Sequence, residues 1–274
     1  MPVKLKEKKM NEQKNVKEIV KEKYAAIAVS SARKCCCGSS NNKIVNYTIM
    51  KDNYEHLEGY VAEADLGLGC GLPTEFADIK KGDIVIDLGS GAGNDVFVAR
   101  ALAGDEGRVI GIDFTDEMII KANYNLDRLG YKNVEFKFGE IEDLPVEENF
   151  ADVVVSNCVL NLVPDKQKAF DEIFRVLKSG GHFCVSDIVI KGELHQGLKE
   201  SAEMYAGCVA GAVQQEEYIR IIGKSGFKNI EIKKTKTIEL PDEVLTKHLN
   251  KEQMKEYKEK QTGIFSITVV GYKS

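Results

Sequence analysis

The sequence predicts an α/β protein whose mostly parallel sheet carries helices on both faces. Three observations lead to this fold class. The apolar strand Ile84–Leu88 runs through a glycine-rich turn into a helix at Asp95–Ala103. Strand and helix patterns then alternate regularly from residue 108 to residue 189, which is typical of a parallel sheet with right-handed crossovers. Two alternating strands, Ile230–Leu240 and Ile264–Tyr272, end the chain and are expected to form a hairpin at one edge of the sheet.

The turn after the first strand has glycine at three alternate positions, Gly89, Gly91 and Gly93. Glycine accepts positive φ and, because it has no Cβ, lets a ligand lie against the backbone. The helix that follows presents free N–H groups and the positive end of its dipole, which favour a carboxylate or a phosphate. We therefore expect a nucleotide-like ligand at this turn, although a tight turn with nothing bound has the same pattern.

The residues around this turn narrow the choice of nucleotide. The dinucleotide fingerprint needs a third glycine where this chain has Asn94, which disfavours a pyridine-nucleotide oxidoreductase. The acid Asp113 follows the next strand, in a position to accept hydrogen bonds from ribose hydroxyls.

The central elements follow one another with short connections. The patterns predict strand Arg108–Ile112, helix Asp116–Leu129, strand Val134–Phe138, strand Val153–Ser156, helix Asp165–Leu177 and strand His182–Val189.

Segments on both sides extend this core. Before it we expect a helix within Asn11–Val29, a cysteine-bearing loop at Ser30–Asn42 and a second glycine-rich loop at Ala64–Pro73. After it we expect helices at Leu198–Ala212 and Gln215–Ser225, and an exposed, partly helical insert at Glu243–Lys260 between the last two strands. The chain is thus divided into an N-terminal extension at 1–75, a ligand-binding core at 76–190 and a C-terminal elaboration at 191–274.

Composition limits the class of function. The 274 residues are 43% hydrophobic and 30% charged, as in an ordinary globular protein. A net charge of −5, with lysines scattered among acids, gives no support to a nucleic-acid partner. No apolar run reaches the length of a membrane span, and the N-terminus lacks the apolar core of a signal peptide. We expect a cytoplasmic protein without a membrane partner.

Seven cysteines stand out in such a protein, because a reducing compartment does not maintain disulfides. They are Cys35, Cys36, Cys37, Cys70, Cys158, Cys184 and Cys208. No pair has the spacing of a zinc site, so a zinc-binding, nucleotide-sensing protein is a weaker alternative from another class. Cys184 lies inside a strand and is expected to be core, whereas Cys158 follows the fourth strand directly. A cysteine there is either a small buried apolar residue or a reactive thiol.

The run from Asp87 to Gly93, with the later acid, resembles motif I of S-adenosylmethionine (SAM)-dependent methyltransferases, whose class I members have a Rossmann-like, seven-stranded, mostly parallel sheet closed by an edge hairpin. The resemblance implies that Asp113 holds the ribose and that Phe114 and Met118 cover the adenine. Asn157 is expected beside the methionine part of the cofactor, and the loop after the third strand beside the adenine edge. The expected cofactor-binding residues are Asp87, Gly89, Ser90, Gly91, Gly93, Asp113, Phe114, Met118, Glu140, Ile141 and Asn157. For Glu140 and for Glu142 the alternative is a pair of exposed loop acids.

Several stretches together resemble the SAM-dependent arsenite methyltransferases, from about Val16 to about Phe227. They are ADLGLGCGLP at 64–73, DLGSGAGND at 87–95, GIDFTDEMIIKA at 111–122, GEIEDLP at 139–145, SNCVLNL at 156–162 and AGCVAGA at 206–212. Those stretches that contain Cys70, Cys158 and Cys208 are the specific part, whereas all class I methyltransferases share the glycine loop.

This resemblance implies a site for trivalent arsenic. Cys158 and Cys208 would hold the arsenic, Cys70 would be a third catalytic cysteine, and a fourth would be one of Cys35, Cys36 and Cys37, with Cys36 slightly favoured. It implies arsenite and methylated arsenicals as substrates and a thiol reductant, thioredoxin or glutathione, as co-substrate. The alternative within the same class is a SAM-dependent methyltransferase acting on a small organic acceptor, with the cysteines incidental.

Overall fold

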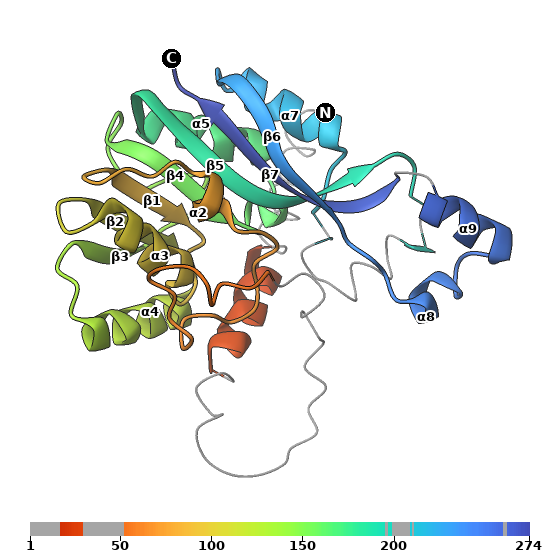
Figure 1. Cartoon of the computed structure of the whole chain (residues 1–274), viewed down its shortest axis with the longest axis horizontal. Helices are drawn as coiled ribbons and strands as arrows, with labels where there is room; N and C mark the ends of the chain where they lie inside the picture. Colours follow the sequence, from red (N-terminus) through yellow and green to blue (C-terminus); the bar gives the residue numbers. More distant parts are fainter. Residues whose placement is uncertain (1–16, 30–51, 195–196, 199–208, 210, 260–261) are drawn as a thin grey trace, which may run out of the picture.

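The computed structural model describes residues 17–29, 52–194, 197–198, 209, 211–259 and 262–274 (Figure 1). A seven-stranded sheet in the order β3-β2-β1-β4-β5-β7-β6 forms its centre. The strands are β1 (Ile84–Leu88), β2 (Arg108–Asp113), β3 (Val134–Phe138), β4 (Ala151–Asn157), β5 (Leu177–Lys191), β6 (Lys228–Thr237) and β7 (Gly263–Tyr272). Strands β1 to β5 pair in parallel, and β7 runs antiparallel between β5 and β6. The predicted fold class is confirmed.

Helices pack on both faces of this sheet. The helices of the described residues are α2 (Pro73–Phe76), α3 (Asn94–Ala103), α4 (Asp116–Leu129), α5 (Lys166–Val176), α7 (Gln215–Lys224), α8 (Asp242–Leu245) and α9 (Lys251–Glu259), with a 3-10 turn, η3 (Leu160–Leu162), after β4. Residues 17–29 are also helical. Helices α3 and α4 contribute to one buried cluster with Val85 and Val153, whereas α5 and α7 contribute to another with Ile86 and Val154. Neighbouring strand residues point to opposite faces, so these two clusters lie on the two sides of the sheet.

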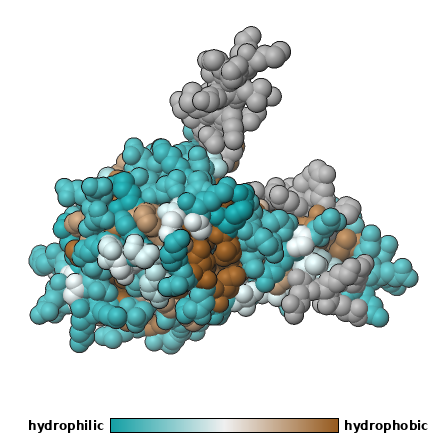
Figure 2. All heavy atoms as spheres, turned by 90° about the horizontal axis from the view of Figure 1, so that it is seen from above, coloured by the Kyte–Doolittle hydropathy of each residue, from teal (hydrophilic) through white to brown (hydrophobic). Residues whose placement is uncertain are grey.

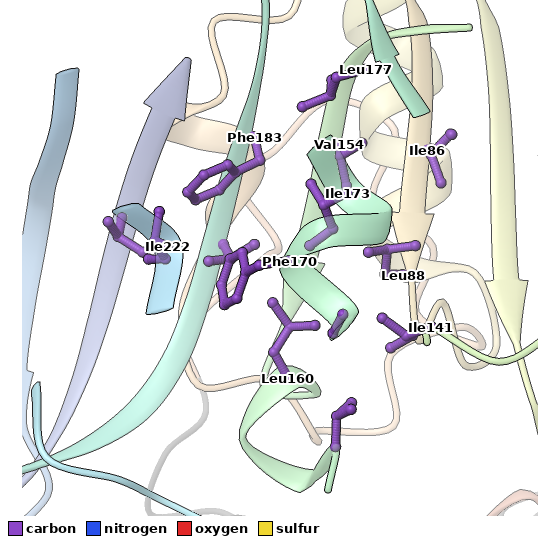
Figure 3. Packing of buried hydrophobic residues seen from close by; sticks show 14 of the residues in the cluster. Ile86, Leu88, Ile141, Val154, Leu160, Phe170, Ile173, Leu177, Phe183 and Ile222 are labelled. Atoms are coloured by element: carbon purple, nitrogen blue, oxygen red, sulfur yellow. The ribbon is translucent and has the colours of Figure 1, made fainter. Parts of the chain in front are cut away.

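The larger cluster fills the space between the sheet and helices α5 and α7. Figure 3 shows Phe170 and Ile173 of α5 directed toward Leu88, Val154 and Phe183 of the strands. The rings of Phe170 and Phe183 lie edge to face, with centroids 5.6 Å apart, an arrangement that aromatic quadrupoles favour. This packing gives the strand ends a rigid base.

Most predicted elements have the predicted bounds within one or two residues, and α4 and β3 match at both ends. The largest difference is β5, which was expected at His182–Val189 but begins at Leu177 and runs to Lys191. Pairing with β7 reaches Lys191, and Leu177 at the other end pairs with Ala151 of β4. Backbone pairing between strands also orders residues that have no strand pattern of their own. Similarly, β6 occupies Lys228–Thr237 rather than Ile230–Leu240.

Some predictions for the segments before and after the core concern residues that the structure does not describe. Of the helix expected within Asn11–Val29, the part at 17–29 is present. The loop Ser30–Asn42 and most of the helix expected at Leu198–Ala212 fall in the undescribed ranges.

The insert between β6 and β7 was expected to be exposed, but part of it is buried. It forms α8 and α9, which extend beyond the sheet in Figure 1, and its Leu245 is 1% exposed. Leu245 belongs to a third buried cluster that also contains Cys70, Cys158 and Val209. The insert therefore forms part of the apolar surroundings of two cysteines.

The surface has the character that the composition predicts. Figure 2 shows a mostly hydrophilic face with hydrophobic residues gathered in a compact patch near its middle. Within the described ranges, no helix is both long and apolar enough to cross a membrane.

Candidate active site

A cleft of about 1180 Å³, measured out to its open mouth, lies at the carboxyl ends of β1, β2, β3 and β4. Ligands of open α/β sheets bind at this edge. The acidic residues that line it are Asp65, Asp87, Asp95, Asp113, Glu140 and Glu142. Lys17 is the single basic side chain among the described residues of the lining. Such a cleft favours a ligand that carries positive charge.

The glycine-rich turn forms the floor of the cleft beside β1. Gly89, Gly91 and Gly93 all have positive φ, as expected for this turn. A Cβ on Gly89 would lie 2.5 Å from the Val159 side chain, so the chain after β4 also needs glycine at this position. Gly93 differs from the prediction, because it does not line the cleft. It caps α3 and packs against the rings of Phe97 and Phe136.

The Asp113 carboxylate holds this turn in place. It accepts hydrogen bonds from the N–H groups of Gly91, at 3.0 Å, and Thr115, at 2.8 Å. Burial raises the pKa of Asp113, although these backbone donors oppose the shift. Asp113 lines the cleft, and its contact with ribose remains a prediction.

The remaining expected cofactor residues also line the cleft, namely Ser90, Phe114, Met118, Glu140, Ile141 and Asn157. The buried Ser90 Oγ and Asn94 Oδ1 atoms have no hydrogen-bond partner among the described residues. Buried polar atoms are normally paired, so these two fit a polar ligand that completes them. Together with the apolar Met118 and Ile141, they fit a nucleoside cofactor.

The helix at 17–29 contributes residues that were not predicted. Lys17, Val20 and Tyr24 line the cleft. The Lys17 Nζ atom lies 2.6 Å from Glu140 Oε2 and is also paired with Glu142. Burial lowers the pKa of Lys17. The hydrogen bonds to the two glutamates together raise that pKa by more than burial lowers it, so the net shift is upward. Lys17 and Glu140 are 123 residues apart in the sequence, so no local pattern predicts their ion pair.

Glu140 and Glu142 therefore differ in exposure. The Glu140 side chain is 51% exposed, and Glu142 is buried.

Cys70 lies in the glycine-rich loop at Ala64–Pro73. It is 0% exposed and does not line the cleft. Asn157 clamps its loop, because the Asn157 amide accepts from the Cys70 N–H at 3.0 Å and donates to the Gly71 carbonyl at 2.8 Å. Side chains at Gly69 or Gly71 would overlap Asn157 or Ser186. The two glycines next to Cys70 thus allow its backbone to reach the strand ends.

Tyr54 and Asp95 complete this clamp, and neither was predicted. The Tyr54 hydroxyl donates to the Asp95 carboxylate at 3.0 Å, and the Asn157 amide donates to it at 3.2 Å. Burial raises the pKa of Asp95 to about 6, against the effect of these two donors.

Cys158 lines the cleft and is 2% exposed. Its φ of +62° is unusual for a residue with a side chain, and such a conformation persists only when its surroundings hold it. Its N–H donates to the Ser186 carbonyl at 2.7 Å. Cys70 and Cys158 belong to the same buried cluster, and both are thiols.

The other cysteines are placed differently. Cys184 is core as predicted, with its thiol 3.1 Å from the Pro73 carbonyl, and burial raises its pKa. Cys208 and Cys36 lie outside the described residues. However, Val209, which follows Cys208 in the chain, packs in the cluster of Cys70 and Cys158.

Buried carboxylates in and near the cleft predict how stability depends on pH. Burial raises the pKa values of Asp87, Asp95, Asp113 and Asp187, to about 6 for Asp95 and about 7 for Asp187. Each of these carboxyl groups has a higher pKa in the folded protein than in the unfolded chain. At pH values between the two, the folded protein therefore binds more protons than the unfolded chain. Stability is therefore lost as pH rises through them, and we expect the free energy of unfolding to fall by about 4 kcal/mol between pH 5 and pH 8.

Urea unfolding followed by circular dichroism at several pH values measures this slope. Asp95→Asn should make it shallower, whereas replacing the exposed Asp105 in the same way should not. A free energy of unfolding that rises from pH 5 to pH 8 would contradict the prediction.

Comparisons with known proteins agree with this site. A sequence model described as "Methyltransferase domain" matches residues 79–226, just over half of the chain. The chain belongs to the class I methyltransferase family. This methyltransferase is 41% identical over 230 residues to an arsenite methyltransferase of Halobacterium salinarum, covering 79% of this chain and 58% of that protein. It is 37% identical over 168 residues to the human arsenite methyltransferase, covering 58% of this chain and 44% of that protein.

A solved structure is also similar. The arsenic(III) S-adenosylmethionine methyltransferase from Chlamydomonas reinhardtii matches with a TM-score of 0.62 and 34% identity, covering 75% of this chain and 67% of that one. This methyltransferase spans about half the length of the curated relatives that it matches first. The family implies SAM as cofactor, which is cationic at its sulfonium and suits the acidic cleft.

Proposed function

We propose that the protein transfers a methyl group from SAM to trivalent arsenic held by Cys158, Cys208 and Cys70. The observation that carries this proposal is that Cys158 lines the cofactor cleft and shares a buried cluster with Cys70, which is distant in the sequence. Val209, the residue after Cys208 in the sequence, belongs to that cluster too. The named activity of the similar proteins supports the choice of arsenic.

Thiolates suit this substrate. Soft sulfur ligands favour soft metal and metalloid centres, and three of them leave the lone pair of trivalent arsenic open on one face. SAM, when bound, supplies a sulfonium methyl group with a neutral thioether as leaving group. The cysteines hold the arsenic with its lone pair toward that methyl, and such orientation contributes about 7–11 kcal/mol in favourable cases. No general base is needed, because the attacking lone pair carries no proton.

Transfer of the methyl group raises the formal oxidation state of arsenic from three to five. Two electrons must then return to it before another cycle. We propose that a pair of thiols, Cys70 with one of Cys35, Cys36 and Cys37, supplies them, losing two protons and forming a disulfide. Thioredoxin or glutathione, as an external thiol, then reduces that disulfide. This cycle requires reduced cysteines, which fits a cytoplasmic location.

The deciding experiment incubates the full chain with methyl-labelled SAM, arsenite and a dithiol, and separates the arsenic products. We expect label in methylated arsenicals and formation of S-adenosylhomocysteine that depends on both arsenite and thiol. Methylated arsenicals in place of arsenite test whether later methylation steps also occur. Label that appears only in small organic acceptors, with none in arsenic, would overturn the proposal in favour of an ordinary small-molecule methyltransferase.

A further inference from the structure

A polar cluster lies beneath the turn that carries Cys158. Lys166 begins α5, and its Nζ atom donates to the carbonyl oxygens of Asn161, at 2.9 Å, and Val163, at 3.0 Å. A lysine in the first turn of a helix is opposed by the helix dipole, which favours acids there. Its ammonium group instead binds the carbonyl of Asn161, within η3, and that of Val163, which directly follows η3. Lys166 thus fixes the shape of residues 160–163.

Asp187 of β5 is a buried acid that acts electrostatically on Lys166. It is 1% exposed, and its Oδ2 accepts a hydrogen bond from the buried Tyr218 hydroxyl at 2.9 Å. Its Oδ1 has no hydrogen-bond partner among the described residues. Burial lowers the pKa of Lys166, and the charges of Asp187 and Glu142 oppose that shift. Both acids are themselves buried.

The turn that follows Cys158 also lies against Gly211. Cys158 stands two residues before η3 in a left-handed conformation. On the other side, the Asn161 carbonyl that Lys166 holds lies directly against the Cα of Gly211, where any Cβ would overlap it. Gly211 follows Cys208 by three residues in the sequence.

We infer that Lys166 is a positioning residue of the thiol site. Its ammonium group fixes the carbonyls of Asn161 and Val163 in the turn that follows Cys158, and Gly211 packs against the first of these carbonyls. The inference rests on the proposed arsenic chemistry, but it assigns a role to residues that contact neither the cofactor nor the arsenic. Because Lys166 does not line the cleft, its removal should affect thiol geometry rather than cofactor binding.

The test replaces Lys166 with methionine, which keeps the length of the side chain and removes the two donors. We expect the dissociation constant for arsenite to rise about 10-fold, because two charge-assisted hydrogen bonds are lost. The dissociation constant for SAM should stay within about 3-fold, since none of its expected contacts changes. Arsenite binding is measured through protection of Cys158 against alkylation, read by mass spectrometry, and SAM binding by calorimetry.

Lys168→Met is the matched control, because Lys168 lies on the same helix and its side chain contacts neither carbonyl; it should behave as wild type. Lys166→Gln keeps one amide donor and should lie between wild type and Lys166→Met, and thermal melting checks that each variant folds. If Lys166→Met does not fold, Lys166→Gln must show the same selective loss of arsenite binding.

Unchanged arsenite affinity, or equal losses for arsenite and SAM, would overturn the inference. Failure of the wild type itself to bind arsenite would instead reject the proposed function.

Discussion

Cys158→Ser is expected to slow methylation of arsenite at least about 1,000-fold, equivalent to about 4 kcal/mol of activation free energy. A hydroxyl is a hard ligand that does not replace a thiolate on trivalent arsenic. Serine adopts the same backbone conformation, so the SAM site should persist and the dissociation constant for SAM should stay near that of wild type. Product formation with labelled SAM and calorimetry with SAM measure the two effects. Cys208→Ser should give the same result.

Cys184→Ser is the matched control for this prediction. Cys184 is also a fully buried thiol, but it lies within β5, and its sulfur contacts the Pro73 carbonyl, to which a serine hydroxyl donates equally well. We expect methylation within about 3-fold of wild type, because no arsenic ligand is lost. Full turnover by Cys158→Ser or by Cys208→Ser would refute the assignment of arsenic to these sulfurs.

Gly211→Ala is expected to reduce arsenite methylation about 100-fold through geometry alone, since misplacement of a reacting group by about 1 Å has effects of this size. The added Cβ would overlap the Asn161 carbonyl oxygen, so the segment that follows Cys208 must move away from the turn after Cys158. The separation of the two sulfurs should increase, whereas the cofactor contacts remain. The rate of methylation and the dissociation constant for SAM are measured side by side.

Gly223→Ala controls for the loss of a glycine. Gly223 lies within α7, where the nearest atom to an added Cβ is 3.8 Å away. Alanine is the better helix former there, so stability should rise by about 0.5–1 kcal/mol and activity should not change. If Gly211→Ala is as active as Gly223→Ala, the close contact with Asn161 does not position the cysteine segment.

Local patterns were sufficient to predict most of the architecture. Helix α4 has strong amphipathic spacing and a glycine directly after it, and both of its ends match the prediction. The buried strands around β1 consist of apolar runs, and the turn after β1 has glycine where the backbone has positive φ. The cleft lies where these strands end, and ten of the eleven predicted cofactor residues line it.

The remaining parts of the site depend on contacts between residues that are far apart in the chain. Asn157 was expected to contact the cofactor, but its amide also clamps the loop of Cys70, 87 residues away. Lys17 pairs with Glu140 across 123 residues, and Lys166 supports a turn that receives Gly211. No periodicity or spacing encodes such pairs, because they form only when the sheet has brought the segments together.

The sequence by itself therefore determined the class of fold, the cofactor turn and the thiols that are candidates for chemistry. These depend on properties of individual residues and their neighbours: hydrophobic periodicity, the freedom of glycine and the softness of sulfur. Only the tertiary structure decided that Cys70 is buried and does not line the cleft, that Gly93 packs away from it, and that Lys166 binds the carbonyls of Asn161 and Val163. Those placements follow from close packing and charge pairing across the sheet, whose energies depend on distances in space rather than on separation in the chain.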